Sequence, residues 1–246
     1  MPTALLAVGA DGAPGGWLAA LAFGDRTTGH VDRIELQLPS TFAELAALRT
    51  DGAPFAVDVP MGLPDVVEPR ACDVAARKAL GARKSSVFTP PSRPLLAAAT
   101  YTDARDLVEL ARRTDPGAKG LSAQAFGIVP KVREADEFLR AHPDARDWLF
   151  ECHPELSFQQ LAGDEQALAP KKSVAGGARR VALVVERFPR ALDIMAGFGA
   201  PGRAELVDAL DALVCLHTAL RVRTGDHVTL GDGRRDAHGL PMRMVV

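Results

Sequence analysis

We predict an α/β fold with a mixed sheet, because apolar runs of strand length alternate with longer amphipathic runs of helix length. Three apolar runs, at residues 5–8, 17–23 and 31–38, come before the first helix signal. A stretch rich in glycine separates the first run from the second, which is typical of a β-hairpin. The sheet is therefore expected to begin with three consecutive strands.

The first helix and the fourth strand follow directly. Thr41 and Glu44 have the spacing of a capping box, which predicts a helix that begins there and ends near Arg49. A short apolar strand at 54–59 carries Asp58 near its end and is stopped by the proline-containing residues 60–64. Three strands, a helix and a further strand form the opening half of an RNase H-like fold, although several α/β folds begin in this way.

The middle of the chain is rich in proline and charge. We interpret residues 65–147 as an insertion over the sheet of a single RNase H-like domain that spans residues 1–246. The core is expected to resume with a strand at 148–152, and Pro154 is expected to open the next helix. Helices are predicted near residues 72–80, 102–113, 131–141, 155–161, 177–188 and 203–221.

The composition is that of an ordinary globular protein, with 47% hydrophobic and 24% charged residues. The net charge of −2 argues against nucleic-acid binding by overall charge, but it leaves room for a local basic patch. The apolar runs are too short to span a membrane, and the cysteines show no paired spacing. We expect a cytoplasmic protein without a membrane partner, with its thiols reduced at Cys72, Cys152 and Cys215.

Acidic residues stand at strand ends and inside an apolar helix. An ionised carboxylate in such a setting is costly unless something compensates its charge. Two divalent cations roughly 4 Å apart would compensate several carboxylates and suit in-line displacement at phosphorus. Capping or turn formation is the alternative role for any single member of the set. The residues predicted to hold Mg²⁺ or Mn²⁺ are Asp11, Asp58, Glu151, Asp208 and Asp211.

The last predicted helix has two distinct faces. Asp208 and Asp211, three residues apart, share one face with small neighbours that would let the helix approach a strand end closely. The second face is expected to pack on the core and comprises Leu206, Leu210, Leu213 and His217.

A basic segment runs from Arg70 to Arg93, where six basic residues face the single acid Asp73. A solvated helix face is the alternative interpretation of this segment. As a binding surface, it would place cationic and hydroxyl donors against phosphate. The residues predicted to contact the phosphates of a nucleic acid or nucleotide are Arg70, Arg77, Arg83, Lys84, Ser85, Ser86 and, further along the chain, Lys172.

Several motifs in order resemble a known family. They include GADGAPGGW at 9–17, DVPMGLP at 58–64, ECHPE at 151–155 and DALDA at 208–212, and Lys171-Lys172-Ser173 also fits. They are similar to domain-of-unknown-function family four hundred and twenty-nine (DUF429), described as predicted nucleases of RNase H-like fold. The resemblance implies that fold and a nuclease-like acidic site. Its catalytic residues would be Asp11, Asp58, Glu151 and Asp211.

We therefore expect a metal-dependent nuclease or phosphodiesterase that uses a two-metal mechanism. Two alternatives stay open. An ATP-dependent phosphotransferase of the sugar-kinase and actin type would use Asp11 and Gly12 with Gly15 and Gly16 as a phosphate hairpin, and residues 58–62 as a second phosphate loop. A non-catalytic nucleic-acid-binding module would keep the fold without turnover. Either a monomer or a homodimer is compatible with the exposed edge of such a sheet.

Overall fold

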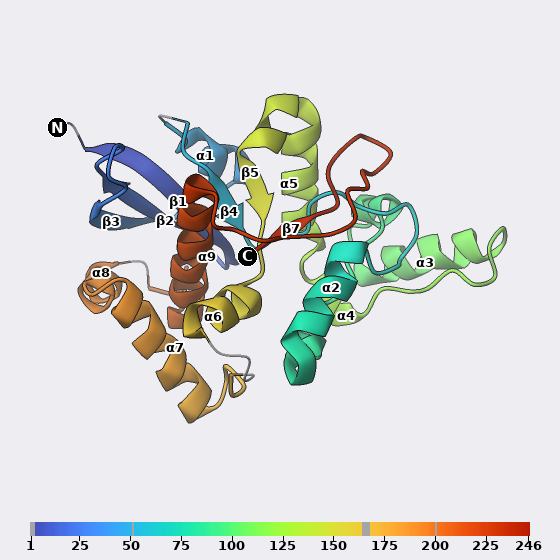
Figure 1. Ribbon diagram of the computed structural model, residues 1–246. Coiled ribbons are helices and arrows are strands. Elements are labelled where there is room, and N and C mark those ends of the chain that lie inside the picture. Colours follow the sequence, from blue (N-terminus) through green and yellow to red (C-terminus); the bar gives the residue numbers. More distant parts are fainter. Residues whose placement is uncertain (1–2, 51, 164–167, 200) are drawn as a thin grey trace.

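The computed structural model describes residues 3–50, 52–163, 168–199 and 201–246. Its main sheet has five strands in the order β3-β2-β1-β4-β5 (Figure 1). β2 is antiparallel to β1 and to β3, whereas β1, β4 and β5 are parallel. The prediction of an α/β fold with a mixed sheet is confirmed. The strands are β1 (Ala4–Ala13), β2 (Gly16–Gly24), β3 (Val31–Gln37), β4 (Phe55–Val57) and β5 (Leu149–Glu151).

The β1–β2 hairpin is longer than predicted. We expected the first strand to end at Val8, but β1 continues to Ala13, so that Asp11 pairs with Leu18 inside the ladder. Gly9 lies inside this strand, where it allows close packing against α9 (Leu206–Thr224). A Cβ atom at Gly9 would lie 1.9 Å from the backbone nitrogen of Leu216.

Helices cover both faces of the sheet (Figure 1). α9 (Leu206–Thr224) packs along β1 and β2 on one face. On the other face, α1 (Phe42–Ala47) and α5 (Val129–Ala141) enclose a core that includes Val57 and Phe55. A second core lies between the sheet and α9 and includes Ala56. Residues of one strand alternate between the two cores, because successive side chains point to opposite faces.

The N-terminus of α1 follows the predicted capping box in part, because Thr41 is the N-cap but Glu44 bonds to the residue before it. The Thr41 hydroxyl accepts a hydrogen bond from the Glu44 backbone at 3.2 Å, and the Glu44 carboxylate accepts one from the Ser40 backbone at 2.8 Å. The reciprocal bonds fix the start of the helix against the end of β3.

α9 is more deeply buried than the two-faced prediction allows. Leu210, Leu213 and His217 are buried as expected, but Leu206 is 57% exposed. Residues 209–220 are buried all round, because the sheet lies on one side of α9 while α6 (Pro154–Ala162) and α7 (Val174–Arg187) lie against the helix elsewhere.

The middle segment contains the three helices that the sequence predicts, and it also contributes to the core. α5 inserts Val129, Val132 and Leu139 into the apolar cluster beneath the sheet. None of the helices in the described ranges is long and apolar enough to cross a membrane. The remaining elements are α2 (Ala71–Leu80), α3 (Tyr101–Arg112), α4 (Ala123–Phe126), α8 (Ala191–Gly197) and the small sheet of β6 (Thr229–Leu230) with β7 (Met244–Val245).

Candidate functional site

Strand register places Asp11 and Asp58 side by side. β1 and β4 pair in parallel with Ala10 opposite Val57, and the Asp58 backbone donates to the Ala10 carbonyl at 2.9 Å. The two aspartates are the next residues on the two chains. Asp11 lies two residues after Gly9, whose backbone faces α9, so alternation directs the Asp11 side chain toward that helix.

α9 supplies a third carboxylate to this point. Asp211 is only 4% exposed, and it lies beside Ala212, whose carbonyl packs against Gly9 of β1. Burial raises the pKa of Asp11 well above its usual range, and Asp58, Asp211 and Asp208 raise it further. The three carboxylates of Asp11, Asp58 and Asp211, which we call the acidic cluster, therefore lie close enough to repel one another.

The acidic cluster is short of positive charge. Burial raises the pKa of Asp58 to about 7, although Lys171 opposes the shift. Burial likewise raises the pKa of Asp211 to about 6, again against the effect of Lys171. Burial raises the pKa of Glu151 to about 7 as well, against the effect of Arg70, so these shifts report burial. The acidic cluster differs in its hydrogen bonds, because Asp11 accepts one and Asp58 none from the described residues.

Lys171 is the cation nearest to this cluster. Its Nζ donates to Asp211 Oδ2 at 2.8 Å. Burial opposes the charge on Lys171, but Asp211, Asp11 and Asp58 outweigh it, so the pKa of Lys171 is raised. We predicted a phosphate contact for the neighbouring Lys172, which is exposed, and no role at the acidic site for Lys171. The family-like Lys171-Lys172-Ser173 motif was the available signal.

The donor set of the acidic cluster fits a hard divalent cation. Asp58 accepts no hydrogen bond from the residues that the structure describes, and Asp11 accepts one, from the Gly12 backbone at 2.7 Å. Carboxylate oxygens without partners suit Mg²⁺ or Mn²⁺. As they stand, the side chains in the described ranges form no ready group of three or more metal ligands. Cation binding therefore requires carboxylate side chains to rotate.

Asp208 has a structural task at the edge of the cluster. Its Oδ2 accepts a hydrogen bond from the Glu205 backbone at 2.8 Å and caps the start of α9. It still adds to the charge repulsion at Asp11. We therefore treat Asp208 as a cap, as the alternative interpretation of these aspartates anticipates.

The structure does not bring Glu151 into the acidic cluster. β4 and β5 pair with Val57 opposite Glu151, and the Cys152 backbone donates to the Val57 carbonyl at 3.0 Å. Cys152, not Glu151, therefore shares the row of Asp11 and Asp58. Glu151 points to the opposite face of the sheet because it lies one residue earlier.

On that face, Glu151 forms a closed network with Arg70 and Asp73, which we call the buried arginine network. Arg70 donates to both Glu151 oxygens, at 2.6 and 2.7 Å, and its Nη2 donates to Asp73 Oδ1 at 2.7 Å. Glu151 also accepts from the Met61 backbone at 2.7 Å. Arg70 is 3% exposed, so our prediction that it contacts phosphate does not fit its position.

Most of the predicted basic surface is also engaged internally. Arg77 donates to the Val87 carbonyl at 3.0 Å, and Arg83 donates to Glu155 at 3.2 Å. Ser86 donates its hydroxyl hydrogen bond to the Arg83 carbonyl at 2.8 Å. Lys84 and Ser85 stay exposed on the 3₁₀ helix Gly81–Ser86.

His153 links this 3₁₀ helix to the end of β5. Its Nδ1 accepts from the Glu155 backbone at 3.2 Å, which caps α6, and this role leaves Nε2 to donate to the Ser86 carbonyl at 3.2 Å. Burial lowers the pKa of His153, which favours the neutral ring that makes both bonds.

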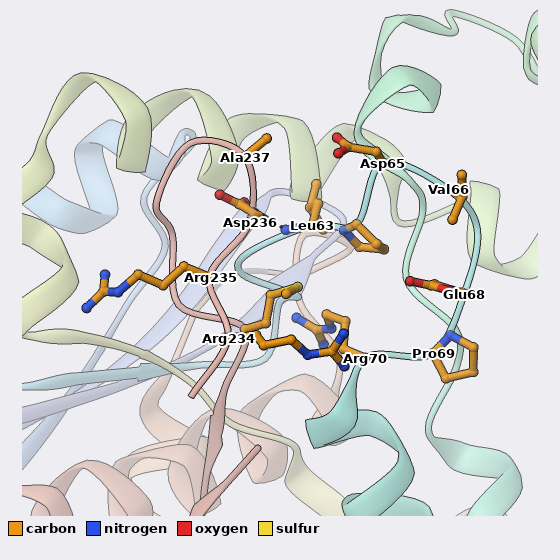
Figure 2. A pocket seen from close by; sticks show the side chains of 12 residues that line it. Leu63, Asp65, Val66, Glu68, Pro69, Arg70, Arg234, Arg235, Asp236 and Ala237 are labelled. Atoms are coloured by element: carbon orange, nitrogen blue, oxygen red, sulfur yellow. Dashed lines mark hydrogen bonds between the residues drawn. The ribbon is translucent and has the colours of Figure 1, made fainter. Parts of the chain in front are cut away.

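A cavity of about 300 Å³ opens elsewhere, beside the buried arginine network. Figure 2 shows Asp65 and Glu68 on one side of it and Arg234 and Asp236 on the other. No member of the acidic cluster is among the described residues that line it. The cavity and the acidic cluster are therefore separate features, and the predicted residues Asp11, Asp58 and Asp211 belong to the cluster.

The family comparison agrees with the resemblance of the motifs. The chain matches the family described as "Protein of unknown function (DUF429)" over residues 9–235. No curated protein and no solved structure matches the chain. The matched range contains the whole acidic cluster and Lys171. Because the match covers most of its length, the chain belongs to the DUF429 family.

Proposed function

We propose that the protein is a divalent-metal-dependent phosphodiesterase, with a nucleic acid or nucleotide as its substrate. The observation that carries this proposal is the acidic cluster. Three carboxylates from β1, the end of β4 and α9 converge with too little positive charge, and two of them have oxygens without hydrogen-bond donors in the described parts of the chain. A binding module has little need for carboxylates held at this electrostatic cost.

The sheet supports the finer assignment to an RNase H-like fold. Its order β3-β2-β1-β4-β5, with only β2 antiparallel to its neighbours, is the order expected for such a core. The carboxylates of β1 and β4 lie at the carboxyl ends of parallel strands, where open α/β sheets usually bind ligands.

Each residue of the site has a distinct task in this proposal. Asp11 and Asp58, held in register by the strand ladder, and Asp211, held by α9, would bind Mg²⁺ or Mn²⁺. When bound, the ion supplies Lewis acidity at phosphorus and a hydroxide nucleophile near neutral pH. Lys84 and Ser85, which are exposed on the 3₁₀ helix, would donate to substrate phosphates.

The phosphotransferase alternative is less well supported. The tip of the β1–β2 hairpin is already engaged, since the Gly15 backbone donates to the Arg203 carbonyl at 2.8 Å. A Cβ atom at Gly16 would lie 2.2 Å from the Pro39 carbonyl oxygen. These glycines therefore serve protein packing, and the hairpin tip has little free backbone for a phosphate.

Hydrolysis assays test the proposed function. Wild-type protein is incubated with Mn²⁺ or Mg²⁺ and a panel of single- and double-stranded DNA and RNA, together with a bis-aryl phosphodiester. We expect metal-dependent hydrolysis, and a loss of about 100-fold or more in Asp11→Asn and Asp58→Asn. Asp106→Asn, at an exposed position of α3, is the matched control and should retain wild-type activity.

Two results would contradict the proposal. Full activity of Asp58→Asn would remove the acidic cluster from the chemistry. Tight nucleic-acid binding by the wild type without cleavage in any metal would instead favour the non-catalytic binding module.

A further inference from the structure

Another cavity, of about 400 Å³, lies at the end of the sheet opposite the acidic cluster. It is formed by the C-terminal part of α5, by the 3₁₀ helix Pro143–Asp147 that precedes β5, and by the loop before β7. The acidic cluster lies at the carboxyl ends of β1 and β4, and β5 runs parallel to β4, so the two features occupy opposite ends of the strands. The described lining residues are Glu137, Arg140, Ala141, Arg146 and His238.

Further positive charge lies beside this cavity. The Arg243 guanidinium donates to the Arg146 carbonyl at 3.1 Å. Burial lowers the pKa of Arg243, and the charge of Arg235 lowers it further, against the effect of Asp147. Cationic side chains from three segments of the chain therefore gather here. We call Arg140, Arg146, Arg235 and Arg243 the outer arginine group.

Three members of this group, Arg146, Arg235 and Arg243, form no ion pair with the described residues. Instead, Arg146 Nη2 donates to the His238 carbonyl at 3.3 Å, and Arg235 Nη1 donates to the Gly239 carbonyl at 2.8 Å. The Nε atom of Arg146 is buried and has no hydrogen-bond partner in the parts of the chain that the structure describes. A buried donor without an acceptor is costly, so this group lacks an acceptor.

Buried arginines elsewhere in the molecule are paired with carboxylates. Arg70 pairs with Glu151 at 2.6 Å, and Arg180 pairs with Glu155 at 2.7 Å. Within the outer arginine group, Arg140 lies 3.5 Å from a carboxylate of its own helix, and its side chain is 45% exposed. The missing ion pairs are thus a local feature of this cavity and not the general state of arginine in this protein.

Guanidinium groups around one cavity suit a phosphate ligand. The planar fork of arginine bonds two phosphate oxygens at once, and a phosphate group offers several acceptor oxygens and up to two negative charges. An apolar ligand would find little to contact, because the apolar side chain among the described lining residues is that of Ala141. The volume lies within the range of small-molecule sites, about 300–1,000 Å³.

We propose that the outer arginine group binds a phosphate group in this cavity, at a site separate from the acidic cluster. A free nucleotide and the backbone of a nucleic acid share this chemistry, and either can supply the phosphate. The inference goes beyond the proposed function, because binding here requires neither a metal ion nor hydrolysis.

Calorimetric titration in metal-free buffer at physiological salt tests this inference. The ligands are sodium phosphate, ATP and a single-stranded thymidine oligonucleotide, and without metal the acidic cluster repels all three. We expect the wild type to bind at least one of them, and Arg140→Met and Arg146→Met to bind it about tenfold more weakly. Arg105→Met removes the same charge from an exposed position of α3 and should bind as the wild type does.

Each outcome decides the inference or identifies the ligand. Binding of phosphate or ATP would identify a free phosphate compound, and binding of the oligonucleotide alone would identify the nucleic-acid backbone. No binding of any ligand by the wild type would overturn the inference. Wild-type affinity in either variant, once thermal unfolding shows it to be folded, would also overturn it, as would an equal loss in Arg105→Met. Arg140 is exposed, so its variant decides the matter where Arg146→Met does not fold.

Discussion

The sheet carries one acidic centre on each face, and the two differ in how their charge is compensated. In the buried arginine network, two carboxylates share one guanidinium, which donates to both of them through Nε, Nη1 and Nη2. In the acidic cluster, three carboxylates share one ammonium, which contacts only Asp211 directly. In the first centre the guanidinium bonds to both carboxylates, whereas in the second Asp58 accepts no hydrogen bond from the described residues.

This difference shows that a strand-end carboxylate is not functional by virtue of its position alone. Asp58 and Glu151 each follow a short apolar run, yet they face opposite sides of the sheet. The compensating partner decides the role. A carboxylate bound bidentately by a buried arginine stabilises the fold, whereas one without donors is available to a cation.

The largest effect is expected when the buried arginine network is broken. Arg70→Met leaves Glu151 and Asp73 without their guanidinium, and a buried charge without a partner costs about 3–5 kcal/mol. Urea unfolding should show a loss of this size in the free energy of unfolding. Lys78→Met changes an exposed residue of α2, the helix that Arg70 precedes. It should change the free energy of unfolding by less than about 0.5 kcal/mol. An equally small effect of Arg70→Met would erase the distinction between the two centres.

The second effect concerns the packing that builds the acidic cluster. In Gly9→Ala, the new methyl group would lie 1.9 Å from the Leu216 nitrogen and 2.4 Å from the Ala212 oxygen, so α9 must move away from β1. We expect a loss of about 3 kcal/mol in the free energy of unfolding. Because α9 carries Asp211, Mn²⁺ affinity should also fall, which calorimetry can measure.

Gly120→Ala is the matched control, since a Cβ atom there meets nothing within 4 Å. It should leave both stability and Mn²⁺ affinity close to those of the wild type. If Gly9→Ala were destabilised but kept wild-type Mn²⁺ affinity, the position of α9 would not matter to the metal site.

The sequence predicted the elements better than it predicted their partners. Hydrophobic periodicity and capping signals located most of the described helices but missed α4 and α8. The end of a short apolar run located Asp58, whereas Asp11 lies inside β1, which is longer than predicted. The side that Glu151 faces depends on a register difference of one residue between β4 and β5, which no local pattern encodes. Its partner Arg70 is distant in sequence, so a basic segment looked exposed when most of its guanidinium groups are paired internally.

The choice between Lys171 and Lys172 shows the same limit. Both lysines stand just before Ser173, whose hydroxyl accepts a hydrogen bond from the Gly176 backbone at 3.1 Å and caps α7. Both positions hold a lysine in the same short motif, so the sequence does not distinguish them. Only the path of the chain into α7 directs one side chain to Asp211 and leaves the other exposed.

The smallest effect is expected in the pH dependence of stability. It should have opposite signs for a carboxylate whose pKa is raised by burial and one whose pKa is lowered by hydrogen bonds. The pKa of Asp58 is raised by burial to about 7 in the folded protein, above its usual value of 3.8. The folded state therefore binds the proton more tightly than the unfolded state, and Asp58 destabilises the protein progressively as pH rises from about 4 to 7. Without metal, the stability of Asp58→Asn relative to the wild type should therefore increase progressively with pH across this range.

Asp25→Asn supplies the opposite sign, because hydrogen bonds from the Thr27 and Thr28 backbones lower the pKa of Asp25. Relative to the wild type, that variant should lose stability as pH rises through the acidic range. Saturating Mn²⁺ should abolish the advantage of Asp58→Asn at pH 7, since the ion stabilises only a protein that keeps the carboxylate. If Asp58→Asn were still more stable than the wild type in Mn²⁺, no cation would compensate Asp58. The acidic cluster would then be a structural centre like the buried arginine network, with less compensation of its charge.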